Sequence, residues 1–299
     1  MHQSMSHSLR RTASYVPNLI VEFLTDCGVP DPTSEVGFDS VSKKYNGVRQ
    51  NCNGTVVLFA DVSGFTALSE AMAKYGADGP AKVATYLNKY MELMLRIISS
   101  EGGDIFKFAG DAVIVIWPPT ETDIEMTTNC RRAIQCAVRF QYELTAAKLA
   151  PGVELSVKVG IGCGKMSILH LGNKLGRLEY VPVGLPLEDA FSSEHHAEPG
   201  QIIVSRAVAS LVSQYFKWVE IYKGGFARID VNANQGNRKD SSDAKMRNTR
   251  ITTKRNSNAV TTALQRINDG SFDIDALEKK LRAYIPRSIT TMLTKPIAS

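Results

Sequence analysis

The stretch Thr55-Val-Val-Leu-Phe-Ala-Asp61-Val-Ser-Gly-Phe-Thr66 decides the expected fold. Its apolar run, Val56 to Ala60, has the length of a buried strand and leads directly into an aspartate. Ser63-Gly64 then forms a turn before a segment that can begin a helix, and the free backbone N–H groups at such a helix start can bind an anion. The stretch therefore predicts a buried strand that ends at a carboxylate beside an anion site, which suits a metal-bound polyphosphate.

A second stretch, Gly102 to Trp117, has the pattern of a β-hairpin. Two β-rich runs, Ile105–Ala109 and Ala112–Trp117, are joined by Gly110-Asp111, and both residues tolerate the backbone angles of a two-residue turn. If the first strand pairs beside this hairpin, Asp61 and Asp111 converge, and two carboxylates suit a hard cation such as Mg²⁺. For each aspartate taken alone, a cap or turn role remains an open alternative.

Together and in this order, the two stretches resemble the class III nucleotidyl cyclases. Those catalytic halves carry a strand ending in F-x-D-x-S-G-F-T and a hairpin K-F-A-G-D-A, which stand here at Phe59–Thr66 and Lys107–Ala112. The second phrase most closely resembles the bicarbonate-responsive soluble adenylyl cyclases, in their first, metal-donating catalytic half. The resemblance covers about residues 50–222.

The resemblance and the order of elements predict an α+β fold with a ferredoxin-like βαββαβ core, an antiparallel sheet and helices on one face. Apolar spacing predicts a long helix ending near Gly102-Gly103 and another over residues 123–149. Alternation predicts a strand over residues 154–161 and a second hairpin across residues 165–183. Shorter elements are expected as a helix at 185–197, a strand at 201–204, a helix at 205–212 and a last strand at 216–222.

The implied reaction drives the ribose 3′-hydroxyl of ATP onto the α-phosphate, forming cyclic AMP and releasing pyrophosphate. By resemblance, Asp61 and Asp111 are the catalytic metal ligands and bridge two Mg²⁺ ions, with Mn²⁺ or Ca²⁺ as possible substitutes. The carbonyl of Val62 is a further metal ligand. The expected triphosphate-binding residues are Ser63, Gly64, Phe65 and Thr66.

Several groups that the family also needs are missing from this chain. By resemblance, Val181 stands at an adenine-reading position, Glu188 at the position of an asparagine and Ser192 at that of an arginine. None of the three can perform the family's role, so a second cyclase half, in the same longer polypeptide or another chain, is the expected partner. Lys107 matches the position of the lysine that reads adenine in the family. In the metal-bearing half of soluble cyclases, the lysine at this position lines a degenerate second pocket. The alternative is that Lys107 simply pairs with a neighbouring residue of the sheet.

Composition divides the chain of 299 residues into four expected parts. These are an N-terminal extension with a short docking helix (1–49), the cyclase domain (50–222), a polar, disordered linker (223–270) and a C-terminal helical segment (271–299). The net charge of +5 resides largely in residues 237–255, which lack aromatic side chains, so nucleic-acid binding is not expected. Scattered cysteines and the lack of a signal peptide or a membrane-length apolar run favour a cytoplasmic protein.

Two functional alternatives remain open from the sequence. The chain can be a catalytically inactive cyclase-like regulatory or scaffold module that binds nucleotide or a partner cyclase domain, and a preference for GTP is not excluded. His195-His196 has the pattern of a surface pair, because adjacent helix residues point about 100° apart. Gly160-Ile-Gly-Cys-Gly164 lacks the context of a dinucleotide fingerprint and is expected to permit close backbone approach between half-domains.

Overall fold

The computed structural model describes residues 9–26, 38–39, 44–45, 48–145, 153, 155–172, 177–234 and 274–285. The chain divides into two compact units. The first comprises residues 1–51, 167–183 and 250–299, and the second comprises residues 52–166 and 184–249. None of the helices in the described ranges combines the length and the apolar character needed to cross a membrane.

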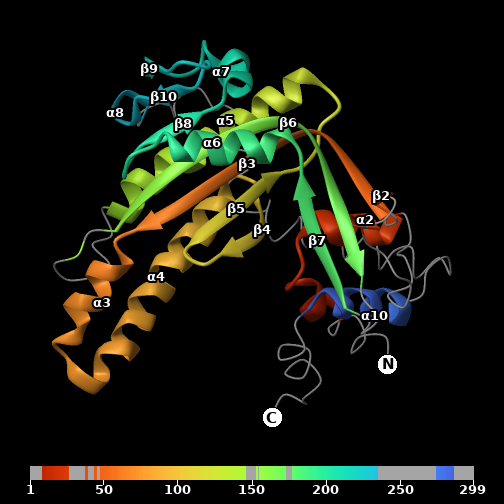
Figure 1. The fold of residues 1–299 in the computed structure, drawn as a ribbon, viewed down its shortest axis with the longest axis horizontal. Helices are drawn as coiled ribbons and strands as arrows, with labels where there is room; N and C mark the ends of the chain where they lie inside the picture. The colour runs from red at the N-terminus through yellow and green to blue at the C-terminus, as the bar shows by residue number, and fades with distance from the viewer. Residues whose placement is uncertain are drawn as a thin grey trace. The chain divides into compact units, whose positions relative to one another are not determined.

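The second unit is built on a mixed sheet in the order β4-β5-β3-β6-β8-β10-β9, which Figure 1 shows with its helices. Strand β5 pairs antiparallel with β3 and β4, and β10 pairs antiparallel with β8 and β9, whereas β6 and β8 pair in parallel. The elements are β3 (Val48–Ser63), α3 (Phe65–Ala73), η1 (Gly76–Asp78), α4 (Gly79–Ser100), β4 (Asp104–Ala109), β5 (Ala112–Trp117), α5 (Asp123–Arg139), η2 (Phe140–Leu144), β6 (Ser156–Gly172), α6 (Leu185–His195), β8 (Ile202–Val204), α7 (Arg206–Val212), β9 (Trp218–Ile221), β10 (Ala227–Ile229) and α8 (Val231–Asn234). The α+β class and the βαββαβ core, from β3 to β6, are confirmed.

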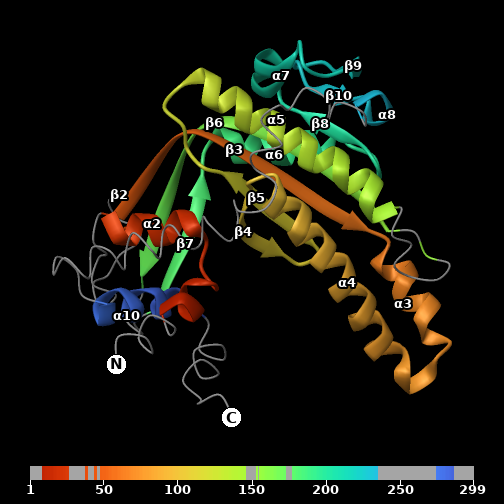
Figure 2. The same cartoon turned by 180° about the vertical axis from the view of Figure 1, so that it is seen from behind.

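One face of this sheet carries the main hydrophobic core. Alternate residues of β3, from Val56 to Val62, point into it, because successive strand residues face opposite sides. Helices α4 and α5 cover this face with buried side chains that include Tyr90, Ile97 and Ile134. Figure 2 shows both helices in front of the sheet.

Helix α6 packs on the opposite face. The expectation that the helices lie on one face therefore holds for α4 and α5 but not for α6. Figure 1 shows α6 in front of β6, whereas α5 lies behind it. Gly160 and Gly162 alternate along β6 with core residues such as Ile161, and a Cβ at either glycine would meet α6. The close approach predicted for these glycines is therefore to a helix of the same chain, and the missing side chains make room for it.

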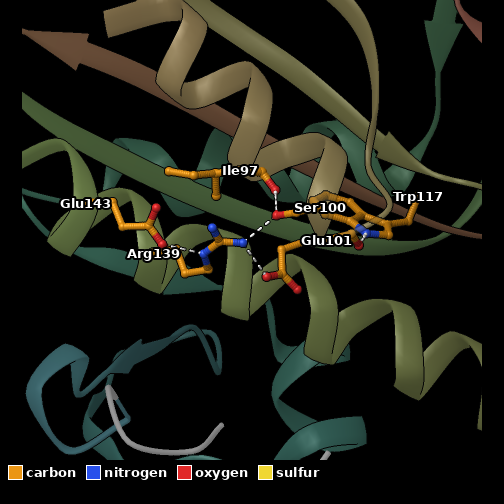
Figure 3. Close-up of polar contacts among 6 residues, drawn as sticks. All are labelled: Ile97, Ser100, Glu101, Trp117, Arg139 and Glu143. Carbon is orange, nitrogen blue, oxygen red and sulfur yellow. Dashed lines mark hydrogen bonds and ion pairs between the residues drawn. The ribbon is translucent and has the colours of Figure 1, made fainter. Parts of the chain in front are cut away.

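A polar cluster ties the base of the β4–β5 hairpin to the end of α5 (Figure 3). The guanidinium of Arg139 contacts Glu101 at 2.8 Å and Glu143 at 2.6 Å, and it also donates to the hydroxyl of Ser100. The indole N–H of Trp117, the last residue of β5, donates to the carbonyl oxygen of Glu101 at 2.9 Å. These contacts anchor the hairpin at the end remote from its Gly110-Asp111 tip.

The second unit extends past the predicted domain end at residue 222. Strand β10 pairs with β8 and β9, and its residues Ala227 and Ile229 are only 2% exposed. The prediction of a disordered linker is therefore wrong for residues 227–234, and residues 235–270 lie outside the described residues. A strand of three residues in a polar stretch is too short to show a period, which is why the sequence pattern missed it.

Other boundaries also differ from the predictions. The α-helical part of the segment predicted over residues 123–149 ends at Arg139 and continues as a π-helical turn, η2, in which Phe140 and Leu144 are buried. The second hairpin is confirmed, since β7 (Leu178–Val183) pairs antiparallel with the end of β6, from Ser167 opposite Val183 to Gly172 opposite Leu178.

The first unit gathers two terminal helices around that hairpin. Helix α2 (Asn18–Asp26) and helix α10 (Ile274–Tyr284) contact one another, and α10 also contacts β7. The buried ring of His170, on β6, stacks on Phe23 and lies 2.7 Å from the Tyr284 hydroxyl through Nδ1. A separate short pairing joins β1 (Phe38–Asp39) and β2 (Lys44–Tyr45). The predicted N-terminal extension therefore contains a helix, α2, and its docking role stays a prediction.

Candidate active site

The strand register places the two predicted metal-binding aspartates at the same end of the sheet. Ala60 of β3 pairs with Val113 of β5, so the next residue of β3, Asp61, lies level with Ala112. Asp111 immediately precedes Ala112, in the turn between β4 and β5. The predicted convergence of the two strand ends is therefore present, although the binding of metal by these residues stays a prediction.

The turn after β3 has the geometry that the sequence suggested. Gly64 adopts φ 109° and ψ 0°, a left-handed conformation that favours glycine, and α3 begins at the next residue, Phe65. The first backbone bond of the helix runs from the N–H of Leu68 to the carbonyl of Gly64 at 2.9 Å. The N–H groups before Leu68 have no partner within the helix, because the first turn of any helix leaves them unpaired. The turn follows Asp61 by three residues and can receive an anion beside that carboxylate.

An ion-paired cluster that sequence reasoning missed surrounds Asp61. The ammonium of Lys158, on β6, lies 3.3 Å from Oδ2 of Asp61 and 2.5 Å from Oε1 of Glu194, on α6. The close ion pair with Glu194, reinforced by the charge of Asp61, raises the pKa of Lys158 above its usual value. One signal was available: Lys158 occupies a polar position in the alternating strand next to β3, on the same side as Gly160.

Helix α6 carries the positions at which the expected transition-state groups are absent. Glu188 and Ser192 lie one helical turn apart and are exposed. Phe191 contacts the ring of Phe59 edge-on, with centroids 4.6 Å apart. A pocket of about 520 Å³ lies over this contact. It is lined by Phe59, Phe191, Ser192, Glu194, His195 and His196.

Lys107 and Val181, the residues predicted for a degenerate or base-reading pocket, belong to different units. Lys107 is on β4 opposite Ile114, next to an irregularity in the pairing of β4 with β5. Val181 is on β7 opposite Leu169. Their joint role in a pocket therefore stays a prediction. His195 and His196 are both exposed, as expected of a surface pair.

Comparison with known proteins identifies the family. The sequence model of the family described as the adenylate and guanylate cyclase catalytic domain matches residues 48–233, more than half of the chain. The chain belongs to this family. The match also ends beyond residue 222 and includes β10 and all but the last residue of α8, in agreement with the structure.

Relatives of this cyclase domain include Adenylate cyclase type 10 of Rattus norvegicus, which is 28% identical over 156 residues. That match covers 52% of this chain and 10% of the rat protein. The terminal-differentiation specific adenylate cyclase of Dictyostelium discoideum is 29% identical over 135 residues, which are 44% of this chain and 6% of that protein. The chain thus spans about a tenth or less of the length of these relatives. The predicted resemblance to class III cyclases, with soluble adenylyl cyclases among the relatives, is confirmed.

Solved structures share the fold. The adenylyl cyclase CyaB from P. aeruginosa superposes with a TM-score of 0.50 at 23% identity, covering 61% of this chain and 96% of CyaB. The dimeric guanylyl cyclase domain of the RhoGC fusion protein from Blastocladiella emersonii gives a TM-score of 0.50 at 20% identity, covering 61% and 97%. At these identities the comparison shows the fold alone.

The donor set of the cyclase domain suits a cation that is held partly by its substrate. Asp61 and Asp111 lie at the same end of the sheet, and Val62 follows Asp61 directly in the chain. Among the described residues, no cluster of three or more His, Cys, Asp or Glu side chains could hold a metal by itself. Mg²⁺ is commonly bound by one or two carboxylates and substrate phosphates, so these residues fit such an ion.

Proposed function

We propose that this chain is the metal-donating half of an adenylyl cyclase, which converts ATP to cyclic AMP and pyrophosphate for intracellular signalling. The observation that carries the proposal is the register of β3 and β5, which brings Asp61 and Asp111 to one end of the sheet beside the Gly64 turn. Membership of the cyclase family and the adenylate cyclases among the relatives support the reaction and the choice of ATP.

Each residue of the site then has a defined task. Asp61 and Asp111, with the carbonyl of Val62, hold two Mg²⁺ ions, for which Mn²⁺ or Ca²⁺ can substitute. The ions supply acidification of the ribose 3′-hydroxyl and neutralisation of the leaving pyrophosphate. The backbone N–H groups from Ser63 to Thr66 hold the β- and γ-phosphates at the start of α3. Left-handed Gly64 lets the chain turn close to those phosphates.

The rest of the site comes from a complementary second half. Val181 cannot accept a hydrogen bond from the adenine amino group, the charge of Glu188 repels phosphates, and Ser192 carries no positive charge. Removing one preorganised oxyanion donor costs about 10²- to 10³-fold in rate, and this chain lacks two such groups. The chain by itself is therefore expected to make little or no cyclic AMP, and a brisk rate from the purified chain with Mg²⁺ or Mn²⁺ would contradict the proposal.

The test mixes the chain with a class III cyclase half that carries the adenine-reading residues and the Asn/Arg pair. Cyclic AMP formation from ATP and Mg²⁺ should appear only in the mixture, and GTP in place of ATP tests the choice of base. Asp61→Asn and Asp111→Asn should each abolish the activity and leave the fold intact. Asp123→Asn, an exposed residue in the first turn of α5, is the matched control and should retain full activity.

Wild-type rates in both aspartate variants would rule out the metal assignment. Asparagine serves about as well as aspartate in a helix cap or a tight turn, so activity would survive if the two residues were structural. The same outcome, or an inactive mixture with a second half of proven competence, would favour the alternative of a regulatory or scaffold module that binds nucleotide or a partner cyclase domain.

A further inference from the structure

We infer that Lys158 competes with the divalent cation for Asp61, and that Glu194 decides the outcome of this competition by holding the lysine. The inference rests on the proposed metal role of Asp61. It assigns two positioning residues, on β6 and α6, that the two aspartate motifs do not include.

The fold brings these three side chains together from distant parts of the sequence. Asp61 is on β3 and Lys158 is on β6, the next strand in the sheet. Glu194 reaches them because α6 lies directly against β6, where a Cβ on Gly160 would come within 2.9 Å of the Glu194 Cβ. A bulkier residue at position 160 would hold α6 further from the strand. The contact between Glu194 and Lys158 thus depends on a glycine two residues along the same strand.

The geometry of the cluster is unequal. The Lys158 ammonium lies 2.5 Å from Glu194 and 3.3 Å from Asp61, so Glu194 is the closer partner. The Glu194 side chain is 12% exposed, compared with 25% for Lys158 and 27% for Asp61. Charges that are partly withdrawn from water interact more strongly and are screened less by salt. The lysine therefore has its firm attachment at Glu194 and its weaker contact at Asp61.

This inequality has a direct consequence for a cation at Asp61. A divalent ion that binds this carboxylate must displace the ammonium from it and then tolerate a positive charge nearby. Glu194 eases both steps, since it holds the ammonium after displacement and neutralises its charge. With glutamine at position 194, the ammonium would keep Asp61 as its only charged partner in the cluster and would oppose the ion without compensation.

The experiment measures Mn²⁺ binding to the purified full chain without nucleotide, from the electron paramagnetic resonance signal of free Mn²⁺. Lys158→Gln should tighten Mn²⁺ binding about tenfold, because Asp61 loses its contact with the ammonium and both Asp61 and Asp111 are then available to the ion. Glu194→Gln should weaken binding about tenfold. Each tenfold change corresponds to about 1.4 kcal/mol. Lys165→Gln, an exposed lysine on the same strand, is the matched control and should leave the affinity unchanged.

A double-mutant comparison separates positioning from simple charge. If Glu194 acts mainly through the lysine, Glu194→Gln should weaken binding about tenfold in the native chain but only about twofold in the Lys158→Gln background. Lys158→Arg should restore native-like affinity, because it keeps the positive charge. Equal effects of Glu194→Gln in both backgrounds would overturn the positioning role, as would an unchanged affinity in Lys158→Gln.

Asp61→Asn separates this inference from the proposed function. If Asp61→Asn removes Mn²⁺ binding while the Lys158 and Glu194 variants bind like the native chain, only the competition is refuted. If Asp61→Asn binds Mn²⁺ as the native chain does, the metal role of Asp61 fails and the inference fails with it. Thermal unfolding of every variant shows whether a change in affinity reflects a damaged fold.

Discussion

Gly160→Ala provides the sharpest test of how α6 is positioned. A Cβ at Gly160 would overlap the carbonyl oxygen of Ala190 and the backbone nitrogen of Glu194, and it would lie 2.9 Å from the Glu194 Cβ. Backbone atoms cannot rotate away as a side chain can, so α6 would have to shift by roughly 1.5–2 Å to reach normal contact distances near 3.5–4.0 Å from the Ala190 oxygen. Overpacking of this kind costs about 1–3 kcal/mol, and the backbone overlap places this case near the upper end.

The expected result is a fall in thermal midpoint of roughly 6–12 °C, because about 1 kcal/mol shifts the midpoint by ~2–4 °C in a domain of this size. Gly200→Ala is the control, since a Cβ there would meet nothing within 4 Å and only its φ of 84° opposes alanine. A left-handed alanine costs about 1–2 kcal/mol, so this variant should lose less stability than Gly160→Ala. Circular dichroism melting curves measure both. Equal midpoints for Gly160→Ala and the native chain would refute close packing of α6 on β6.

Three further predictions concern polar groups away from the aspartates. Burial lowers the pKa of His170 to about 4 from an ordinary value near 6.5, so the folded state favours the neutral ring. The free energy of unfolding should therefore decline by up to roughly 3 kcal/mol as the pH falls from about 6.5 toward 4. Denaturant titrations at several pH values measure this decline. Tyr284→Phe removes the hydroxyl that lies 2.7 Å from Nδ1 of His170 and should lower the free energy of unfolding by about 1–2 kcal/mol. Proteolysis near α10 should become faster, and an unchanged cleavage rate would contradict a docking role for this contact. Arg139→Gln removes the ion pair of Glu101, a side chain that is only 18% exposed, and should lower the free energy of unfolding by about 2 kcal/mol in urea titrations. Arg177→Gln breaks an exposed ion pair and should cost about 0.5 kcal/mol or less in the same assay.

Local signals were sufficient for the parts of the fold built from neighbouring residues. The apolar run from Val56 to Ala60, the Gly110-Asp111 turn and the periodic long helix each follow from contacts within a short segment, and the structure contains all three. The same logic failed for β10, where only Ala227 and Ile229 are buried and the flanking stretch is polar. It also missed the π-helical turn at the end of α5, because apolar spacing does not distinguish it from a continued α-helix.

The sequence by itself therefore determined the family, the βαββαβ core and the two aspartates at the ends of neighbouring strands. Motif order and strand periodicity are properties of the chain alone, and antiparallel pairing of β3 with β5 makes the aspartates converge. Only the tertiary structure decided which charges face Asp61, since Lys158 and Glu194 meet it across a sheet and a packed helix. It also decided that α6 lies opposite α4 and α5. The physical reason is that Gly160 and Gly162 add nothing to the apolar periodicity of the sequence. Their effect appears only in the folded protein, where α6 packs closely against β6 because these two residues have no side chains.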